Sequence, residues 1–155
     1  MPQCLLRHQR RSGDPRYPVN TKVMGELSAF LASLHDLSVQ VSSRKGDAIL
    51  GEDFVNARDG RIEAIKAGSP TLVETQVRLM VEALRRRLGV LQQEQQKLLE
   101  MRQKSRRLSP QSEPTILKLL AATMRQCRKV EQELVARELE LSRSRWVPEI
   151  AERRS

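Results

Sequence analysis

The side chains that could carry out catalysis are few and far apart in this sequence. The two histidines are His8 and His35, and the two cysteines are Cys4 and Cys127. A hydrolytic triad needs a histidine that a carboxylate orients beside a nucleophile. Asp36 follows His35 directly, but adjacent residues on a helix point in different directions. We therefore predict that His35 is a surface histidine and that the protein is not an enzyme.

Residue patterns that would hold a metal or a cofactor are also missing. A zinc site needs histidine, cysteine or carboxylate ligands at short spacings, and Cys127 has no such partner nearby in the sequence. The chain contains neither a Gly-x-Gly-x-x-Gly motif nor a P-loop. We therefore expect no catalytic residues, no metal and no cofactor, and we interpret Cys127 as a small apolar residue on a helix.

A run of basic residues in the C-terminal half of the sequence favours a second possible activity, which is the binding of phosphate groups. Phosphate contacts require only positive charges and give binding that weakens steeply with salt. The same segment lacks aromatic side chains, which single-strand binding usually uses for stacking, and the chain has no helix-turn-helix or zinc-finger signature. Nucleic-acid binding is therefore an alternative function, with these candidate residues: Arg85, Arg86, Arg87, Arg102, Lys104, Arg106 and Arg107.

The composition favours long helices over a compact enzyme. Of the 155 residues, 39% are hydrophobic, 30% are charged and only 3% are aromatic, a mixture typical of helical bundles and coiled coils. The formal net charge is +9, which favours an anionic partner but says nothing about the fold. Residues 1–23 contribute much of this excess, with five basic residues against one aspartate.

Apolar residues that recur about every 3.5 positions predict four helices. The clearest stripe is Val23, Leu27, Phe30, Leu34, Leu37 and Val41, as expected for a helix packed along one seam against another. The two C-terminal helices would be long and joined by a short proline-containing turn, which makes an antiparallel hairpin. The predicted helices cover residues 20–42, 47–66, 70–107 and 114–146.

Local signals set the expected helix ends. Asn20 and Asp47 are suitable N-caps, and the sequence Ala67-Gly-Ser-Pro70 combines a glycine C-cap, a serine N-cap and a proline at the first helical position. Glycine weakens a helix interior by about 1 kcal/mol relative to alanine, so we expect the second helix to kink or split near Gly60. Val147-Pro148 should end the last helix.

The two ends of the chain differ in composition from the middle. We predict a flexible basic arm over residues 1–19, a helical bundle over residues 20–147 and a charged tail over residues 148–155. The sequence has no apolar run long enough to span a membrane and no signal-peptide core. Two distant cysteines fit a reducing compartment, so we expect a cytoplasmic protein, with organelle targeting by the arginine-rich N-terminus as the alternative.

The fold class that follows is all-α, an elongated bundle with a long antiparallel, coiled-coil-like hairpin. Such a hairpin can offer an apolar face to a helix of another protein, and the wide apolar surface of the fourth helix is the candidate. The same residues could instead be the core of a bundle or of a homo-oligomer. The candidate partner-binding residues are Leu119, Met124, Val130, Leu134, Leu141 and Trp146.

The segment from Ile49 to Trp146 resembles the FlgN-type flagellar export chaperones, which are small helical proteins with a long hairpin. The resemblance is carried by Ala64-Ile-Lys-Ala-Gly-Ser-Pro-Thr-Leu72, where one helix breaks at a glycine and a leucine-rich helix begins, and by the amphipathic stretch Ile116–Leu141. In that family the last helix captures C-terminal segments of hook-associated proteins. The resemblance implies an adaptor or chaperone function, with Val130, Leu134 and Leu141 as contact positions.

Overall fold

The computed structural model describes the backbone of residues 18–154 and the side chains of residues 21–144. Helices make up nearly all of this part of the chain, and no strand occurs in it, so the all-α prediction is confirmed. The elements in order are α2 (Pro18–Ser43), α3 (Asp47–Leu50), α4 (Glu52–Lys66), α5 (Pro70–Leu108), the 3₁₀ turn η1 (Pro110–Ser112) and α6 (Glu113–Arg154).

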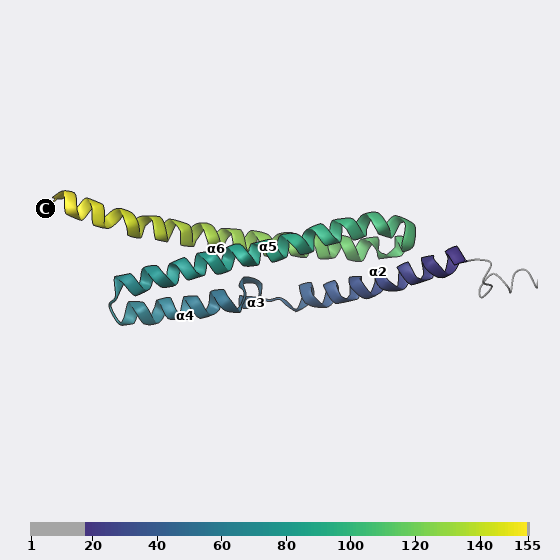
Figure 1. The fold of residues 1–155 in the computed structure, drawn as a ribbon, viewed down its shortest axis with the longest axis horizontal. Coiled ribbons are helices and arrows are strands. Elements are labelled where there is room, and N and C mark those ends of the chain that lie inside the picture. The colour runs from purple at the N-terminus through teal and green to yellow at the C-terminus, as the bar shows by residue number, and fades with distance from the viewer. Residues whose placement is uncertain (1–17, 155) are drawn as a thin grey trace, which may run out of the picture.

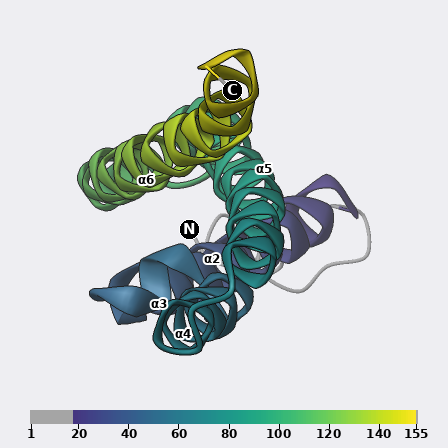
Figure 2. The ribbon, with the colours of Figure 1, turned by 90° about the vertical axis from the view of Figure 1, so that its left-hand side faces the viewer.

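The long helices α5 and α6 form an antiparallel hairpin, and the shorter helices lie along α5 (Figure 1). α4 doubles back on the first half of α5, and α2 lies beside the second half, near the turn that joins α5 to α6. Seen from the end, α5 lies between α4 and α6 (Figure 2). The helix α5 is therefore the central element that every other long helix contacts.

The turn between α4 and α5 follows the predicted boundary. Gly68 has a φ of 70°, and its N–H donates to the carbonyl of Ile65 at 3.0 Å. The N–H of Ser69 donates to the carbonyl of Ala64 at 3.1 Å, which completes a Schellman C-cap. The hydroxyl of Ser69 then accepts from the N–H of Leu72 at 3.3 Å, so Ser69 caps α5 as predicted.

The second predicted helix is split at Gly51, not near Gly60. Gly51 has a φ of 96°, a conformation that side chains with a Cβ rarely adopt, and it separates α3 from α4. Gly60 stays inside α4, where a Cβ would lie 2.5 Å from the side-chain oxygen of Gln76 on α5. Gly60 therefore permits close helix packing, a role that its helix propensity does not reveal.

Three other expected boundaries differ from the structure. α2 begins at Pro18, so Asn20 lies inside the helix instead of capping it. Asp47 is the first residue of α3, and its carboxylate pairs with Arg58 instead of capping the helix N-terminus. α6 continues past Pro148 to Arg154 because a proline removes one helical hydrogen bond without preventing the next turn. The predicted flexible arm falls on residues 1–17, outside the described residues, and on the start of α2.

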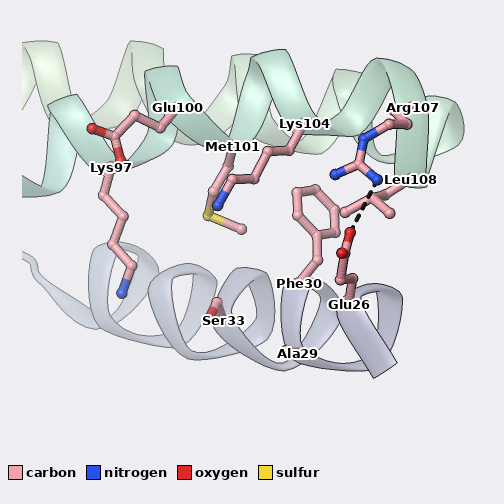
Figure 3. A pocket seen from close by; sticks show the side chains of 10 residues that line it. All are labelled: Glu26, Ala29, Phe30, Ser33, Lys97, Glu100, Met101, Lys104, Arg107 and Leu108. Carbon is pink, nitrogen blue, oxygen red and sulfur yellow. Dashed lines mark hydrogen bonds and ion pairs between the residues drawn. The ribbon is translucent and has the colours of Figure 1, made fainter. Parts of the chain in front are cut away.

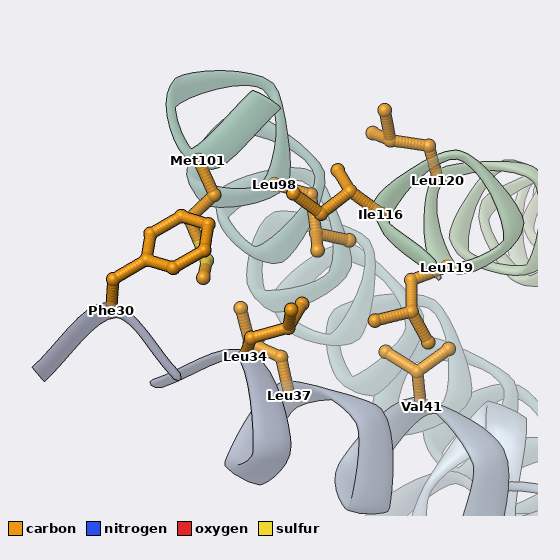
Figure 4. Packing of buried hydrophobic residues seen from close by; sticks show 9 residues of the cluster. All are labelled: Phe30, Leu34, Leu37, Val41, Leu98, Met101, Ile116, Leu119 and Leu120. Carbon is orange, nitrogen blue, oxygen red and sulfur yellow. The ribbon is translucent and has the colours of Figure 1, made fainter. Parts of the chain in front are cut away.

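Two apolar clusters form the core, one at each end of the hairpin. The turn-end core joins α2, α5 and α6 near η1, and Figure 4 shows Leu119 of α6 pointing toward Val41 of α2. Its members are Phe30, Leu34, Leu37, Val41, Leu98, Met101, Ile116, Leu119 and Leu120. The base core joins α3, α4, α5 and α6, with these members: Leu50, Phe54, Ala57, Met80, Ala83, Leu84, Leu91, Cys127 and Val130.

The predicted apolar stripes are largely the buried faces. In α2 the last four stripe residues are buried, whereas Leu27 is half-buried and Val23 is exposed. In α5 the apolar residues at the same spacing are buried except Leu88, which is partly buried against the base core; the buried ones are Val77, Met80, Leu84, Leu91 and Leu98. Periodicity therefore identified the inward faces of α2 and α5, because burial in a helical bundle follows that period.

Candidate functional site

A buried polar junction separates the two cores and fixes the end of α2. The guanidinium of Arg44 donates to both carboxylate oxygens of Glu94 on α5 and, at 3.2 Å, to the side-chain oxygen of Gln126 on α6. The amide nitrogen of Gln126 donates to the carbonyl of Val41 at 3.0 Å. The side chains of Arg44 and Glu94 are only 11% and 13% exposed. Each charged group is therefore compensated, as burial requires.

Two more basic side chains hold the connection between α2 and α4. Arg87 of α5 donates to the carbonyls of Ala48 and Ile49, each at 2.9 Å, and so satisfies acceptors that the short helix α3 leaves without a helical partner. Burial lowers the pKa of Arg87 from its ordinary value, and the nearby charge of Arg44 adds to this effect. Lys129 of α6 donates to the carbonyl of Gly46 at 3.3 Å.

An open groove of about 440 Å³ lies between α2 and α5 at the turn end. Phe30 of α2 and Met101 and Leu108 of α5 supply its apolar surface (Figure 3). The polar residues that line it are Glu26, Ser33, Lys97, Glu100, Lys104 and Arg107. The groove exists because α2 approaches α5 through its buried stripe near Leu37 and Val41 but leaves space beside Phe30.

The charges along this groove are not balanced. Arg107 pairs with Glu26 across the groove at 3.0 Å. Lys97 and Lys104 lie on α5 seven residues apart, two turns along one face of the helix. Within the described residues neither lysine forms an ion pair, and Figure 3 shows Lys97 extending from α5 toward α2. The groove therefore combines an apolar floor with three basic and two acidic side chains, which leave a net charge of +1.

The structure places the predicted partner-binding residues of α6 in three different settings. Leu119 and Val130 are buried in the turn-end core and the base core, so the prediction of a docking surface at these two positions is wrong. Leu134 and Leu141 are half-buried, and Leu134 packs against the base core. Met124 is exposed as predicted, and Trp146 lies outside the described side chains. The inward stripe was mistaken for a free face because both are apolar.

Sequence reasoning missed a set of exposed apolar residues on α6. Leu117, Val135 and Leu139 are exposed together with Met124. All but Leu139 flank the buried stripe of Ile116, Cys127 and Val130, roughly 100° further round the same helix. The sequence does contain a signal for these residues, which is a second set of apolar positions beside the buried stripe of α6. By itself this pattern indicates only a wide apolar surface on the helix.

The predicted nucleic-acid residues do not form one free surface. Arg87 is a structural ligand of α3, Arg102 pairs with Glu113 at 3.5 Å, and Arg107 pairs with Glu26. Arg85 and Arg86 lie 4.0 Å from Glu138 and 3.9 Å from Asp53. In the part of the chain with described side chains, only Lys104 and Arg106 of this set are exposed and make no ion pair.

The net positive charge is concentrated at the turn end. Residues 97–129, which surround the turn, carry nine lysines and arginines and two glutamates. Residues 47–93 and 131–144, at the other end, carry nine basic and eleven acidic residues. The basic residues at the turn end are Lys97, Arg102, Lys104, Arg106, Arg107, Lys118, Arg125, Arg128 and Lys129.

His35 and Cys127 are the histidine and the cysteine that the structure describes, and both occupy ordinary structural positions. His35 is exposed on α2, as predicted for a surface histidine. Cys127 is buried in the base core, where desolvation raises the pKa of its thiol. Among the described side chains, no three histidine, cysteine or carboxylate groups lie close enough together to hold a metal ion. The described helices also include none with the length and apolar character needed to cross a membrane.

Comparisons with known proteins found no matching family model, no similar curated protein and no similar solved structure.

Proposed function

We propose that this protein is a non-enzymatic binding module that captures an amphipathic, acidic helix of another protein in the groove between α2 and α5. The observation that carries the proposal is the groove itself, with two lysines along it that form no ion pair within the described residues. Docking of a helix in a groove is a common mode of protein recognition. Apolar anchors supply the affinity in this mode, and flanking charges orient the bound segment.

The dimensions of the groove define the ligand. The groove follows α5 from Lys97 to Leu108, a helical length of about 16 Å. This length accommodates about three turns of a bound helix. The bound helix would place apolar side chains against Phe30 and Met101, and two carboxylates seven residues apart would meet Lys97 and Lys104. An export-chaperone function would be one form of this proposal, but the comparisons give it no support.

A designed peptide pair tests the proposal. The first peptide is a fluorescein-labelled amphipathic helix with leucines on one face and two glutamates spaced by seven residues, and the second has lysines in place of the glutamates. We expect the acidic peptide to bind at least roughly tenfold more tightly in fluorescence anisotropy titrations. Lys97→Glu and Lys104→Glu together should abolish this preference, whereas Lys118→Glu on α6, a matched charge change outside the groove, should leave it unchanged.

Two results would contradict the proposal. Equal affinity for the acidic and basic peptides would mean that the lysines along the groove do not select the ligand. An affinity that stays the same in Met101→Gln, which makes the groove floor polar, would mean that the peptide binds elsewhere. Circular dichroism of each variant shows whether the helices are intact before either conclusion is drawn.

Polyanion binding at the turn end is the second candidate function. The observation that favours it is the excess of seven positive charges over residues 97–129. Binding of a labelled DNA duplex should then weaken steeply between low and moderate salt, with a slope that falls when Lys104 and Arg106 are changed to glutamine. A binding curve that does not depend on salt, or no binding at low salt, would exclude this candidate.

A further inference from the structure

One exposed flank of α6 carries a regular row of positions. Starting at Leu117, every fourth and then third residue lies on this face, and all eight positions of the row are exposed. They are Leu117, Ala121, Met124, Arg128, Glu131, Val135, Glu138 and Ser142. Such alternation of four and three is the spacing of a coiled-coil seam. The helix therefore has two seams, one buried against the core and one exposed beside it, about 100° further round the helix.

The charges on this outer row change sign at its middle. Its N-terminal half contains the basic residue Arg128, and its C-terminal half contains the acidic residues Glu131 and Glu138. The neighbouring exposed residues follow the same division, with Lys118 and Arg125 before the middle and no acidic residue between Glu113 and Glu131. A second copy of the same helix, placed antiparallel, would therefore present opposite charges at each end of the row.

A second, antiparallel copy of α6 can be placed by a two-fold axis midway between residues 128 and 131. The exposed rows of the two copies then face each other. Arg128 then meets Glu131 of the second copy, and the symmetry repeats this ion pair on the other side of the axis. Met124 meets Val135 of the second copy in the next layer outward, again twice. Every position of the row finds a partner in the row, which is the requirement for an isologous contact.

We infer that this protein forms an antiparallel homodimer through the outer row of α6. The row lies beside the buried stripe of Ile116, Cys127 and Val130, and all eight of its residues are exposed, although Glu138 also lies 4.0 Å from Arg85 of α5. The arrangement also places the basic turn end of one copy toward the other end of its partner, where acidic residues exceed basic ones. The dimer leaves the groove between α2 and α5 open, since that groove does not involve α6.

A charge exchange at the two-fold axis tests the dimer. Sedimentation equilibrium of the full chain should show a monomer–dimer equilibrium. Arg128→Glu and Glu131→Arg should each weaken the dimer by at least roughly tenfold, because each substitution replaces the two ion pairs at the axis by two pairs of like charges. The double variant should recover the parental dissociation constant to within about threefold, since the same pairs form with reversed polarity. Lys22→Glu on α2 is the matched control and should not change the equilibrium.

Three results would overturn the inference: a monomer at every concentration, single variants that dimerise like the parent, or a double variant that stays as weak as the single variants. The affected residues are all exposed, so folding is not at risk, and circular dichroism verifies this. Because peptide capture uses a different surface, loss of dimerisation in Arg128→Glu should leave the anisotropy titration of the groove unchanged. Failure of one proposal is therefore distinguishable from failure of the other.

Discussion

The two ends of this molecule use similar residues to different effect. At the base, α4 packs closely on α5 and the core around Phe54 and Leu84 is sealed from solvent. At the turn end, α2 takes the place of α4 but leaves an open groove beside Phe30. The base also contains cross-helix ion pairs such as Arg61 with Glu140, whereas the turn end retains unpaired lysines.

This difference separates stability from recognition. The base can hold the hairpin together because its core residues are buried and its charges are nearly balanced. The turn end has an open groove and an excess of positive charge, and both features favour association with another molecule. Six single substitutions, in four groups of decreasing expected effect, test this separation.

Truncation of the phenylalanine in each core should give unequal losses. Phe54 is 1% exposed in the base core, so Phe54→Ala should lower the free energy of unfolding by about 3–5 kcal/mol. Phe30 borders the groove, so water can enter the space that Phe30→Ala creates, and we expect a smaller loss of about 1–3 kcal/mol. Urea unfolding followed by circular dichroism measures both. Equal losses would mean that the two ends are enclosed to the same degree.

Removal of the polar junction should release α2 selectively. Arg44→Ala leaves the carboxylate of Glu94 buried without its partner and should lower stability by about 2–4 kcal/mol. Hydrogen exchange should then accelerate in α2 more than in α4, because the junction connects only the former to α5 and α6. The double variant Arg44→Ala/Glu94→Ala should recover part of the loss. Uniform acceleration in both helices would show that α2 and α4 unfold together.

Two glycines should respond in opposite directions to alanine. Gly51→Ala forces a Cβ into a backbone with φ of 96°, so we expect a loss of about 1–2 kcal/mol and a disturbed junction between α3 and α4. Gly89→Ala, inside α5 with open space around the new methyl group, should instead stabilise by about 0.5–1 kcal/mol. Thermal unfolding of both variants measures the difference. Stabilisation by both would show that Gly51 is not needed for the break.

The smallest expected effect is on the stability of the protein at acidic pH. The hydrogen bonds from Arg58 lower the pKa of Asp47 from its ordinary value. A carboxyl with a lowered folded-state pKa contributes stability above its unfolded pKa and loses that contribution as the pH falls through the folded value. Asp47→Asn should therefore flatten a small part of the decline in stability below pH 3.8. An identical pH profile for both proteins would show that this exposed pair contributes nothing measurable.

Local signals predicted much of the fold. The stripe in α2, the Gly68–Ser69 boundary and the turn between α5 and α6 all lie where expected, because helix period and capping act over a few residues. The binding surface was predicted less well. Leu119 and Val130 have the same apolar character as exposed Met124, and only their direction relative to the other helices separates them.

Residue patterns alone were enough to predict that this chain forms long helices, which faces of α2 and α5 are buried, and where the excess of positive charge lies along the chain. Only the tertiary structure decided that α2 leaves a groove beside α5, that Arg87 supports α3 instead of a phosphate, and that α6 presents a second row of residues to solvent. The reason is physical: helix formation depends on neighbours within one or two turns, whereas a groove or an ion pair depends on distances between segments that are far apart in the sequence.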